Sequence, residues 1–178
     1  TPTKSSAASD VYKRQQWSIA GIEMELAVLQ QLQPALRKCN WQVTVALYQD
    51  HTTPKAQVLQ VWPGLHEDGI FGLAIDLGST TVAAHLTDLQ TGAVLASSGV
   101  MNPQIRFGED LMSRVSYAMM NSGGDQEMTV AVREAINGLA DDLAKQIGCG
   151  KAQLLEVVFV CNPVMHHLLL GIDPVESV

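Results

Sequence analysis

The residues of this sequence that are best suited to chemistry lie in the segment 76–81, between two apolar segments. A turn of small residues between two strands can expose successive backbone N–H groups toward one point, which forms a nest for phosphate oxygens. Gly78 lets the backbone come close to a ligand, and Ser79, Thr80 and Thr81 add hydroxyl donors without bulk. We therefore expect these four residues to bind a phosphorylated ligand. A simple β-hairpin with an Asp-x-Gly turn is the alternative.

Asp76 has the residue type that metal chemistry requires. It is expected at the end of a buried strand, where an ionised carboxylate needs a partner. A hydrated Mg²⁺ that bridges to nucleotide phosphates is such a partner, because this ion keeps several waters and uses few carboxylates. We predict Asp76 to be the catalytic carboxylate and to hold Mg²⁺ through water.

A second group of polar residues follows the apolar segment 93–100. Its members are Asn102, Gln104, Arg106, Glu109 and Asp110. One interpretation makes Arg106 a phosphate or partner contact and makes Glu109 or Asp110 a positioner of metal or water. The other makes the two acids first-turn helix charges and Arg106 part of a surface ion pair. The sequence leaves both interpretations open.

Hydrophobic periodicity predicts the elements that position these residues. Three apolar segments joined by turn-forming residues indicate an antiparallel meander: residues 70–75, 80–86 and 93–100. Two helices, a strand and a short helix are expected next: residues 108–120, about 125–148, 154–161 and a segment through Leu170. The order βββ-αα-β-α by itself indicates only an α/β or α+β domain.

Residues 16–66 mix a helical pattern with strands. Ile22, Leu26 and Leu29 begin the helical spacing, Pro34 is the expected break, and residues 41–48 and 56–62 have the character of strands. We interpret residues 16–66 as the C-terminal part of a small α+β middle domain with its linker. Residues 67–178 are interpreted as a second domain.

Composition excludes several classes of protein. A hydrophobic content of 47% with 16% charged residues favours a packed core, and a net charge of −7 argues against nucleic-acid binding. Cys39, Cys149 and Cys161 lie far apart, which fits a reducing compartment and offers no metal cluster. No apolar run reaches the length of a membrane span. We expect a soluble cytoplasmic protein without a membrane partner.

The first 15 residues are interpreted as a translated DNA-library adapter, which leaves them without function. The sequence then begins inside a gene, and it stops after residues 171–177 without a closing element. Both ends are expected to be truncations.

Three segments together resemble one family, the reductive activators of corrinoid proteins: residues 72–82 (GLAIDLGSTTV), 102–114 (NPQIRFGEDLMSR) and 160–171 (VCNPVMHHLLLG). The first is shared across actin-like and sugar-kinase-like ATPases, and the other two are more specific. The resemblance covers residues from about 40 to 178. One departure is Cys161, where the family tends to have Gly, which puts the local backbone geometry in doubt.

The resemblance implies a [2Fe–2S] ferredoxin-type domain, absent here, a middle domain and an actin-like ATPase domain. Residues 67–178 would be the truncated, ribonuclease-H-like N-terminal lobe of that ATPase domain. The family uses ATP to drive an electron onto an inactive Co(II) corrinoid of a methyltransferase system and restores Co(I). The implied partner is a corrinoid protein, a homodimer is one expected form, and the implied ATP-binding residues include Asn102, Arg106, Glu109 and Asn162.

The hairpin motif by itself is also compatible with two other functions. One is the ATPase activator of a radical dehydratase, and the other is a non-catalytic or sugar-kinase-like ATP-binding module of the actin fold. Because actin-type sites lie between two lobes, this chain alone is expected to be inactive.

Overall fold

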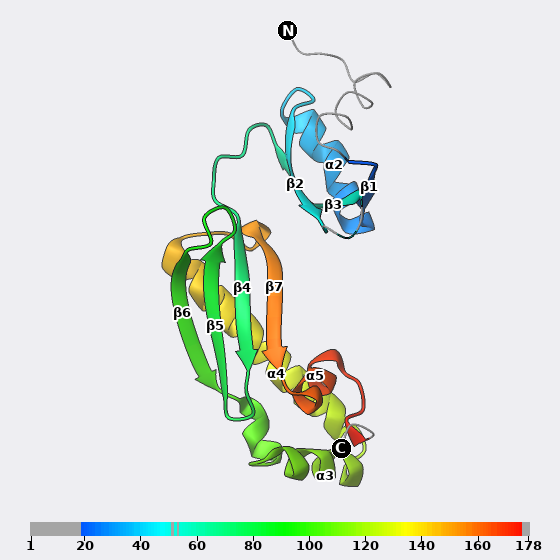
Figure 1. Cartoon of the computed structure of the whole chain (residues 1–178), viewed down its shortest axis with the longest axis vertical. Helices are drawn as coiled ribbons and strands as arrows, with labels where there is room; N and C mark the ends of the chain where they lie inside the picture. Colours follow the sequence, from blue (N-terminus) through cyan, green and yellow to red (C-terminus); the bar gives the residue numbers. More distant parts are fainter. Residues whose placement is uncertain (1–18, 51, 53, 176–178) are drawn as a thin grey trace. The chain divides into compact units, whose positions relative to one another are not determined.

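The chain folds as two compact units, with the boundary between Asp68 and Gly69 (Figure 1). The structure is a computed structural model that describes residues 19–50, 52 and 54–175. The adapter interpretation of residues 1–15 therefore lies outside the described residues. Both units combine helices with a mixed sheet, as the α/β (α+β) prediction required.

The first unit is a three-stranded sheet with one helix packed on it. Its elements are β1 (Gly21–Met24), α2 (Leu26–Lys38), β2 (Val43–Gln49) and β3 (Lys55–Pro63). The strand order is β1-β3-β2, with β1 parallel and β2 antiparallel to β3. Val28 and Ala35 of α2 form a small core with Val58 and Val61 of β3.

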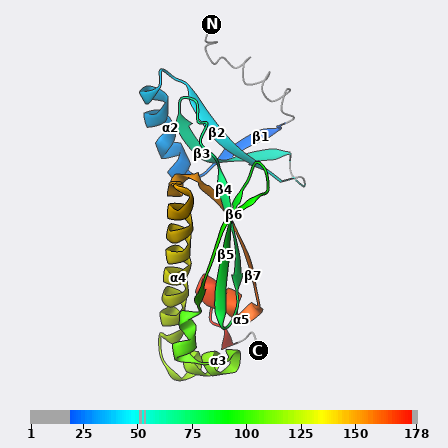
Figure 2. The same ribbon diagram turned by 90° about the vertical axis from the view of Figure 1, so that its left-hand side faces the viewer.

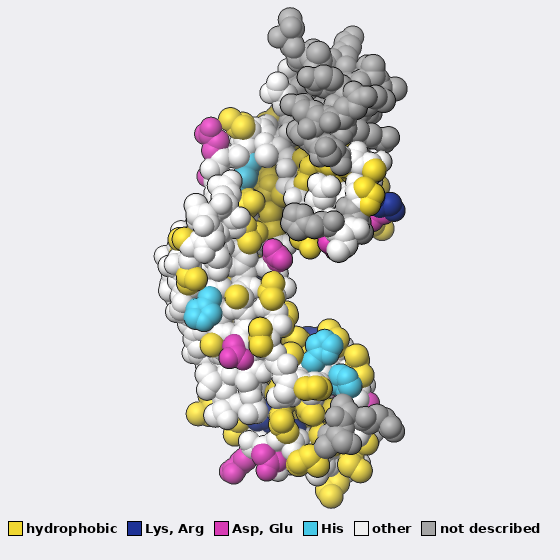
Figure 3. All heavy atoms as spheres, in the orientation of Figure 1, with side chains coloured by type: hydrophobic (Ala, Val, Ile, Leu, Met, Phe, Trp, Pro, Cys, Tyr) yellow, Lys and Arg dark blue, Asp and Glu magenta, His cyan; other side chains and the backbone are white. Residues whose placement is uncertain are grey.

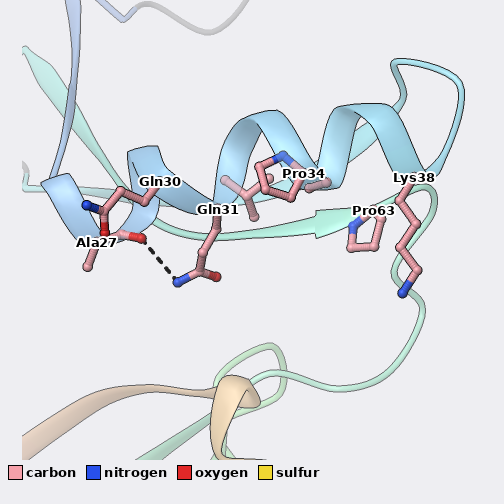
Figure 4. A pocket seen from close by; sticks show the side chains of 8 residues that line it. Ala27, Gln30, Gln31, Pro34, Lys38 and Pro63 are labelled. Carbon is pink, nitrogen blue, oxygen red and sulfur yellow. Dashed lines mark hydrogen bonds between the residues drawn. The ribbon is translucent and has the colours of Figure 1, made fainter.

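Two predictions for this unit were wrong. Pro34 lies inside α2 and does not break it, and Ile22 belongs to β1, where it pairs with Ala56. A proline inside a helix removes one backbone hydrogen bond and crowds the preceding turn. Packing of Val28 and Ala35 on β3 keeps the helix continuous through that position. Figure 4 shows Pro34 within the unbroken ribbon, beside a pocket that it helps to line.

The second unit has the predicted order of elements. They are β4 (Phe71–Leu77), β5 (Thr81–Asp88), β6 (Val94–Met101), the 3-10 helix η1 (Pro103–Phe107), α3 (Leu111–Met120), α4 (Gly124–Ile147), the 3-10 helix η2 (Lys151–Gln153), β7 (Leu154–Cys161) and α5 (Pro163–Leu170). The sheet order is β6-β5-β4-β7. Strands β4 to β6 form the predicted antiparallel meander, and β7 returns parallel to β4.

One face of this sheet carries the core. Alternate residues of β4 and β5, such as Ile75 and Ala84, are buried against α4 and α5 (Figure 2). The opposite face holds Asp76, His85 and Val160, which are exposed. Figure 3 looks onto this uncovered face, where hydrophobic side chains lie scattered among polar ones.

The start of α3 differs from the prediction. The helix was expected to open at Gly108 with acidic residues in its first turn, but it begins at Leu111 and its first turn has none. Asp110 caps it instead, because its carboxylate accepts hydrogen bonds from the backbone N–H and the hydroxyl of Ser113, both at 2.7 Å. Within the described residues, no helix combines the length and apolar character that crossing a membrane requires.

Candidate functional site

The hairpin that connects β4 to β5 is tightly closed. The backbone N–H of Gly78 donates to the carbonyl of Thr81 at 3.0 Å. A Cβ atom at position 78 would lie 2.7 Å from that carbonyl oxygen, closer than side-chain atoms approach a backbone oxygen. The turn therefore requires glycine for space within the hairpin, whereas close approach of a ligand to Gly78 stays a prediction.

Three consecutive carbonyls of the hairpin are held from one side. Asn102 Nδ2 donates to the Gly78 carbonyl at 2.8 Å, and Arg114 Nη2 donates to the Ser79 carbonyl at 2.5 Å. The backbone N–H of Asn102 donates to the Thr80 carbonyl at 2.8 Å. Residues from two of the three sequence motifs thus meet at one turn.

This arrangement leaves donors on the other side of the hairpin. The C=O and N–H of a trans peptide point in opposite directions, and the described part of the chain contains no cis peptide. The N–H groups of Ser79 and Thr80 are therefore directed away from Asn102 and Arg114, and they form no hydrogen bond with any described residue. Successive unpaired N–H groups in a turn are the donor set that phosphate oxygens need.

Asn102 acts as a support behind the hairpin. Its side chain is fully buried, and its Oδ1 caps η1 by accepting from the backbone N–H of Gln104 at 2.9 Å. Gln104 is also buried and donates to the carbonyl of Met128 at 3.0 Å, which anchors η1 to α4. The observed role of Asn102 is therefore to hold the hairpin and to cap η1, and its role in ligand binding stays a prediction.

Arg114 was not selected from the sequence, yet it is the most completely engaged charged side chain near the hairpin. It is fully buried, with Nε donating to the Gly108 carbonyl at 2.9 Å and Nη1 lying 3.4 Å from the sulfur of Met165. Burial lowers the pKa of the Arg114 guanidinium, and the charge of Asp110 opposes that shift. The group stays protonated at neutral pH, because an arginine pKa starts far above it.

Gly108 makes this arrangement sterically feasible. A Cβ atom there would lie 2.7 Å from the Arg114 backbone nitrogen and from two Ser113 atoms. The sequence could have predicted that Arg114 is buried, because Leu111, Arg114 and Val115 have the spacing of residues on one face of a helix.

Asp76 lies at the end of β4 on the uncovered face of the sheet. The strand is buried as expected, but the Asp76 side chain is exposed, so burial does not require a partner for its carboxylate. Strand alternation explains the difference: Ile75 and Leu77 point into the core, and the residue between them points out. The predicted catalytic and Mg²⁺-binding roles of Asp76 stay predictions. Burial, and then the charge of Asp76, raise the pKa of the Cys161 thiol. Cys161 pairs across β4 and β7 with Leu77, the residue after Asp76.

Asn162 follows Cys161, which pairs with Leu77 at the end of β4, so α5 begins beside the hairpin strand. The Asn162 side chain accepts from the backbone N–H of Met165 at 2.9 Å and caps α5. Its observed role is therefore structural, and its role in ligand binding stays a prediction. Cys161 is half-buried and packs against the core.

Arg106 and Glu109 lie elsewhere on the surface of the unit. The Arg106 guanidinium is 4.6 Å from the centre of the Phe107 ring, in a pocket shared with Glu127 and Val130 of α4. Glu109 is exposed just before the cap of α3. The structure records no contact of either side chain with the hairpin.

The described residues contain no group of three or more His, Cys, Asp or Glu side chains that could hold a metal ion. The three cysteines, which all lie in this part of the chain, are free. The hairpin thus offers two backbone N–H groups unpaired within the described residues, and Asp76 is exposed three positions before the first of them.

Fold and hairpin together define a mixed α/β unit in which the turn after β4 carries two backbone N–H groups left unpaired by the described residues, those of Ser79 and Thr80. The sequence identifies the family: residues 71–177 match the RACo middle region and residues 13–68 match the RACo linker region. The chain therefore belongs to the RACo family of corrinoid reductive activators.

Two relatives extend this finding. The chain is 30% identical over 108 residues to the corrinoid activation enzyme RamQ of Eubacterium limosum, which covers 61% of this chain and 18% of RamQ. The solved structure of a reductive activator for corrinoid, iron-sulfur protein superimposes with a TM-score of 0.81 and 33% identity. That match covers 98% of this chain and 28% of the solved chain. The chain thus spans under a third of either relative.

Proposed function

We propose that this chain is part of an ATP-dependent reductive activator, which returns the Co(II) corrinoid of a methyltransferase system to Co(I). The observation that carries the proposal is the likeness of nearly the whole chain to a reductive activator, at 33% sequence identity. The partner would be a corrinoid protein. The similarity to RamQ, a corrinoid activation enzyme, supports the same assignment.

The second unit would be the ribonuclease-H-like N-terminal lobe of an actin-like ATPase domain, spanning residues 67–178. Its four-stranded mixed sheet with a closed hairpin between β4 and β5 supports this assignment. Residues 16–66 would end a preceding domain and its linker. The separation of the chain into two compact units at residue 68 supports that boundary.

The residues present fit the phosphates of ATP. The unpaired N–H groups of Ser79 and Thr80, with the hydroxyls of both residues and of Thr81, would hold phosphate oxygens. Asp76 is exposed at the strand end and would orient Mg²⁺ through water, since an exposed carboxylate can reach a hydrated ion. ATP, once bound, supplies the free energy for an unfavourable electron transfer.

The [2Fe–2S] group would belong to a domain outside the residues described here, because these contain no cluster of ligands for it. This chain would contribute nucleotide binding and the mechanical link to that domain. Free cysteines at three separate positions fit a cytoplasmic setting. A homodimer is the assembly that we would test first.

The experiment uses the full-length gene product, a corrinoid protein and an anaerobic reductant. We expect conversion of Co(II) to Co(I), followed by visible absorption, to depend on ATP and to be lost in Asp76→Asn. Asp142→Asn is the matched control, because Asp142 is an exposed carboxylate on α4 in a surface ion pair with Lys145 at 3.7 Å. ATP binding without any effect on the corrinoid would refute the proposal and favour a binding module.

A further inference from the structure

We propose that Arg114 is the positioning residue of the phosphate-binding hairpin, and that it supplies a buried positive charge behind the bound phosphate. This inference rests on the proposed function of the hairpin. It assigns a role to Arg114, the last residue of the second motif, for which the family resemblance implied none. It also explains why a fully buried arginine lies at this point of the fold.

The first argument is the direction of the peptide groups. Arg114 Nη2 donates to the Ser79 carbonyl, and the same peptide unit carries the N–H of Thr80. A donor bound to the carbonyl of a peptide polarises that peptide and strengthens its N–H as a donor. Arg114 therefore both fixes the direction of the Thr80 N–H and makes it a better partner for an anion.

The second argument is the charge. Among the described residues Arg114 forms no ion pair, and its partners are two carbonyl oxygens and the sulfur of Met165. Asp110 acts on it by charge without a salt bridge. A buried charge whose nearby counter-charge makes no direct contact with it is costly, so a further anion across one peptide layer would be favoured. A phosphate at the N–H face of the hairpin is placed to be that anion.

The third argument is the geometry of the side chain. Nε, Nη1 and Nη2 each have a separate partner, from the η1–α3 connection, α5 and the hairpin. A lysine carries the same charge on a single nitrogen and cannot reproduce three divergent contacts. The arrangement therefore predicts that charge alone restores only part of the effect.

The test measures affinities of the full-length protein for ATP, ADP and adenosine by isothermal titration. We expect Arg114→Met to weaken ATP and ADP binding by about 10- to 100-fold, the loss associated with one charge-assisted hydrogen bond. Adenosine binding should stay unchanged, because adenosine has no phosphate. Arg114→Lys should fall between Arg114→Met and the wild type.

Arg133→Met is the matched control. Arg133 also donates through Nε to a backbone carbonyl, that of Leu169 at 2.8 Å, but it stands on α4 and makes no recorded contact with the hairpin. Its ATP-to-adenosine affinity ratio should equal the wild-type ratio.

The outcomes separate the two proposals. A wild-type protein that fails to bind ATP overturns the proposed function and this inference with it. ATP binding by the wild type with an unchanged ATP-to-adenosine ratio in the Arg114 variants overturns this inference alone. If Arg114→Met does not fold, the ratio measured for Arg114→Lys decides, because a purely structural role would lower both affinities together.

Discussion

Asn102 joins the hairpin to the helical part of the second unit, and its removal should be costly. Asn102→Ala would leave two groups without these partners, the part-buried Gly78 carbonyl and the buried Gln104 N–H. At roughly 1.5 kcal/mol for each group, the loss is at most about 3 kcal/mol. With an m-value of about 2 kcal/mol/M, the urea midpoint of this unit should fall by at most about 1.5 M.

Two spectroscopic signals can show which of the two units Asn102→Ala destabilises. All three tryptophans precede residue 69, so tryptophan fluorescence reports on the first unit only. Far-UV circular dichroism includes α4, the 24-residue helix of the second unit. Asn102→Ala should shift the dichroism transition of the second unit and leave the fluorescence transition in place.

Asn121→Ala is the control, because Asn121 is exposed and donates to the Tyr117 carbonyl at the end of α3. Its effect should stay within about 0.5 kcal/mol. Asn102→Asp separates capping from support: the carboxylate can still cap η1, but it places an oxygen against the Gly78 carbonyl. Wild-type stability in Asn102→Asp would refute the reasoning, because the bond to Gly78 would then contribute nothing.

Three further predictions follow from the same contacts. Gly78→Ala should destabilise the second unit in urea unfolding, because its Cβ would meet the Thr81 carbonyl. The control Gly138→Ala, in α4, would meet nothing within 4 Å and should stabilise the unit by about 0.5–1 kcal/mol in the same assay. Hydrogen bonds from Ser113 lower the pKa of Asp110, so its contribution to stability is present above the unfolded pKa of about 4 and disappears as pH falls through the folded pKa. The stability difference between wild type and Asp110→Asn should therefore shrink in acid, and a difference independent of pH would contradict this assignment. Purified residues 16–178 should show no ATP turnover in a phosphate-release assay, since an actin-type site needs two lobes and the proposal assigns one to these residues; measurable hydrolysis would contradict this.

The order of elements in the second unit was predictable because each has a clear local signal. Alternation in β4 and β5 and the four-residue spacing of Met128, Val132 and Ile136 in α4 depend on neighbours along the chain. Pro34 was misjudged because its local cost is offset by packing between α2 and β3, which no window of sequence contains.

The hairpin turn could be predicted from the sequence, but the side chains that hold it could not. The small residues 78–81 signal a turn by their types alone. Helical spacing places Arg114 on the buried face of α3, but its contact with Ser79 could not be predicted, because that hydrogen bond joins residues 35 positions apart. Asp76 lies at the strand end as predicted, but the exposure of its side chain was missed, because the residue between two inward-facing residues of a strand has to face out.

The long separations behind the hairpin also bear on synthesis. The turn leaves the ribosome first, Arg114 follows Ser79 by 35 residues, and Met165 follows Arg114 by a further 51. At roughly 5–20 residues per second, the nascent hairpin waits about 2–7 s for the guanidinium and about 3–10 s more for the sulfur that contacts it. During that interval β4 also lacks its parallel neighbour β7. The newly made strand edge is therefore the segment of this unit that a chaperone would have most reason to cover.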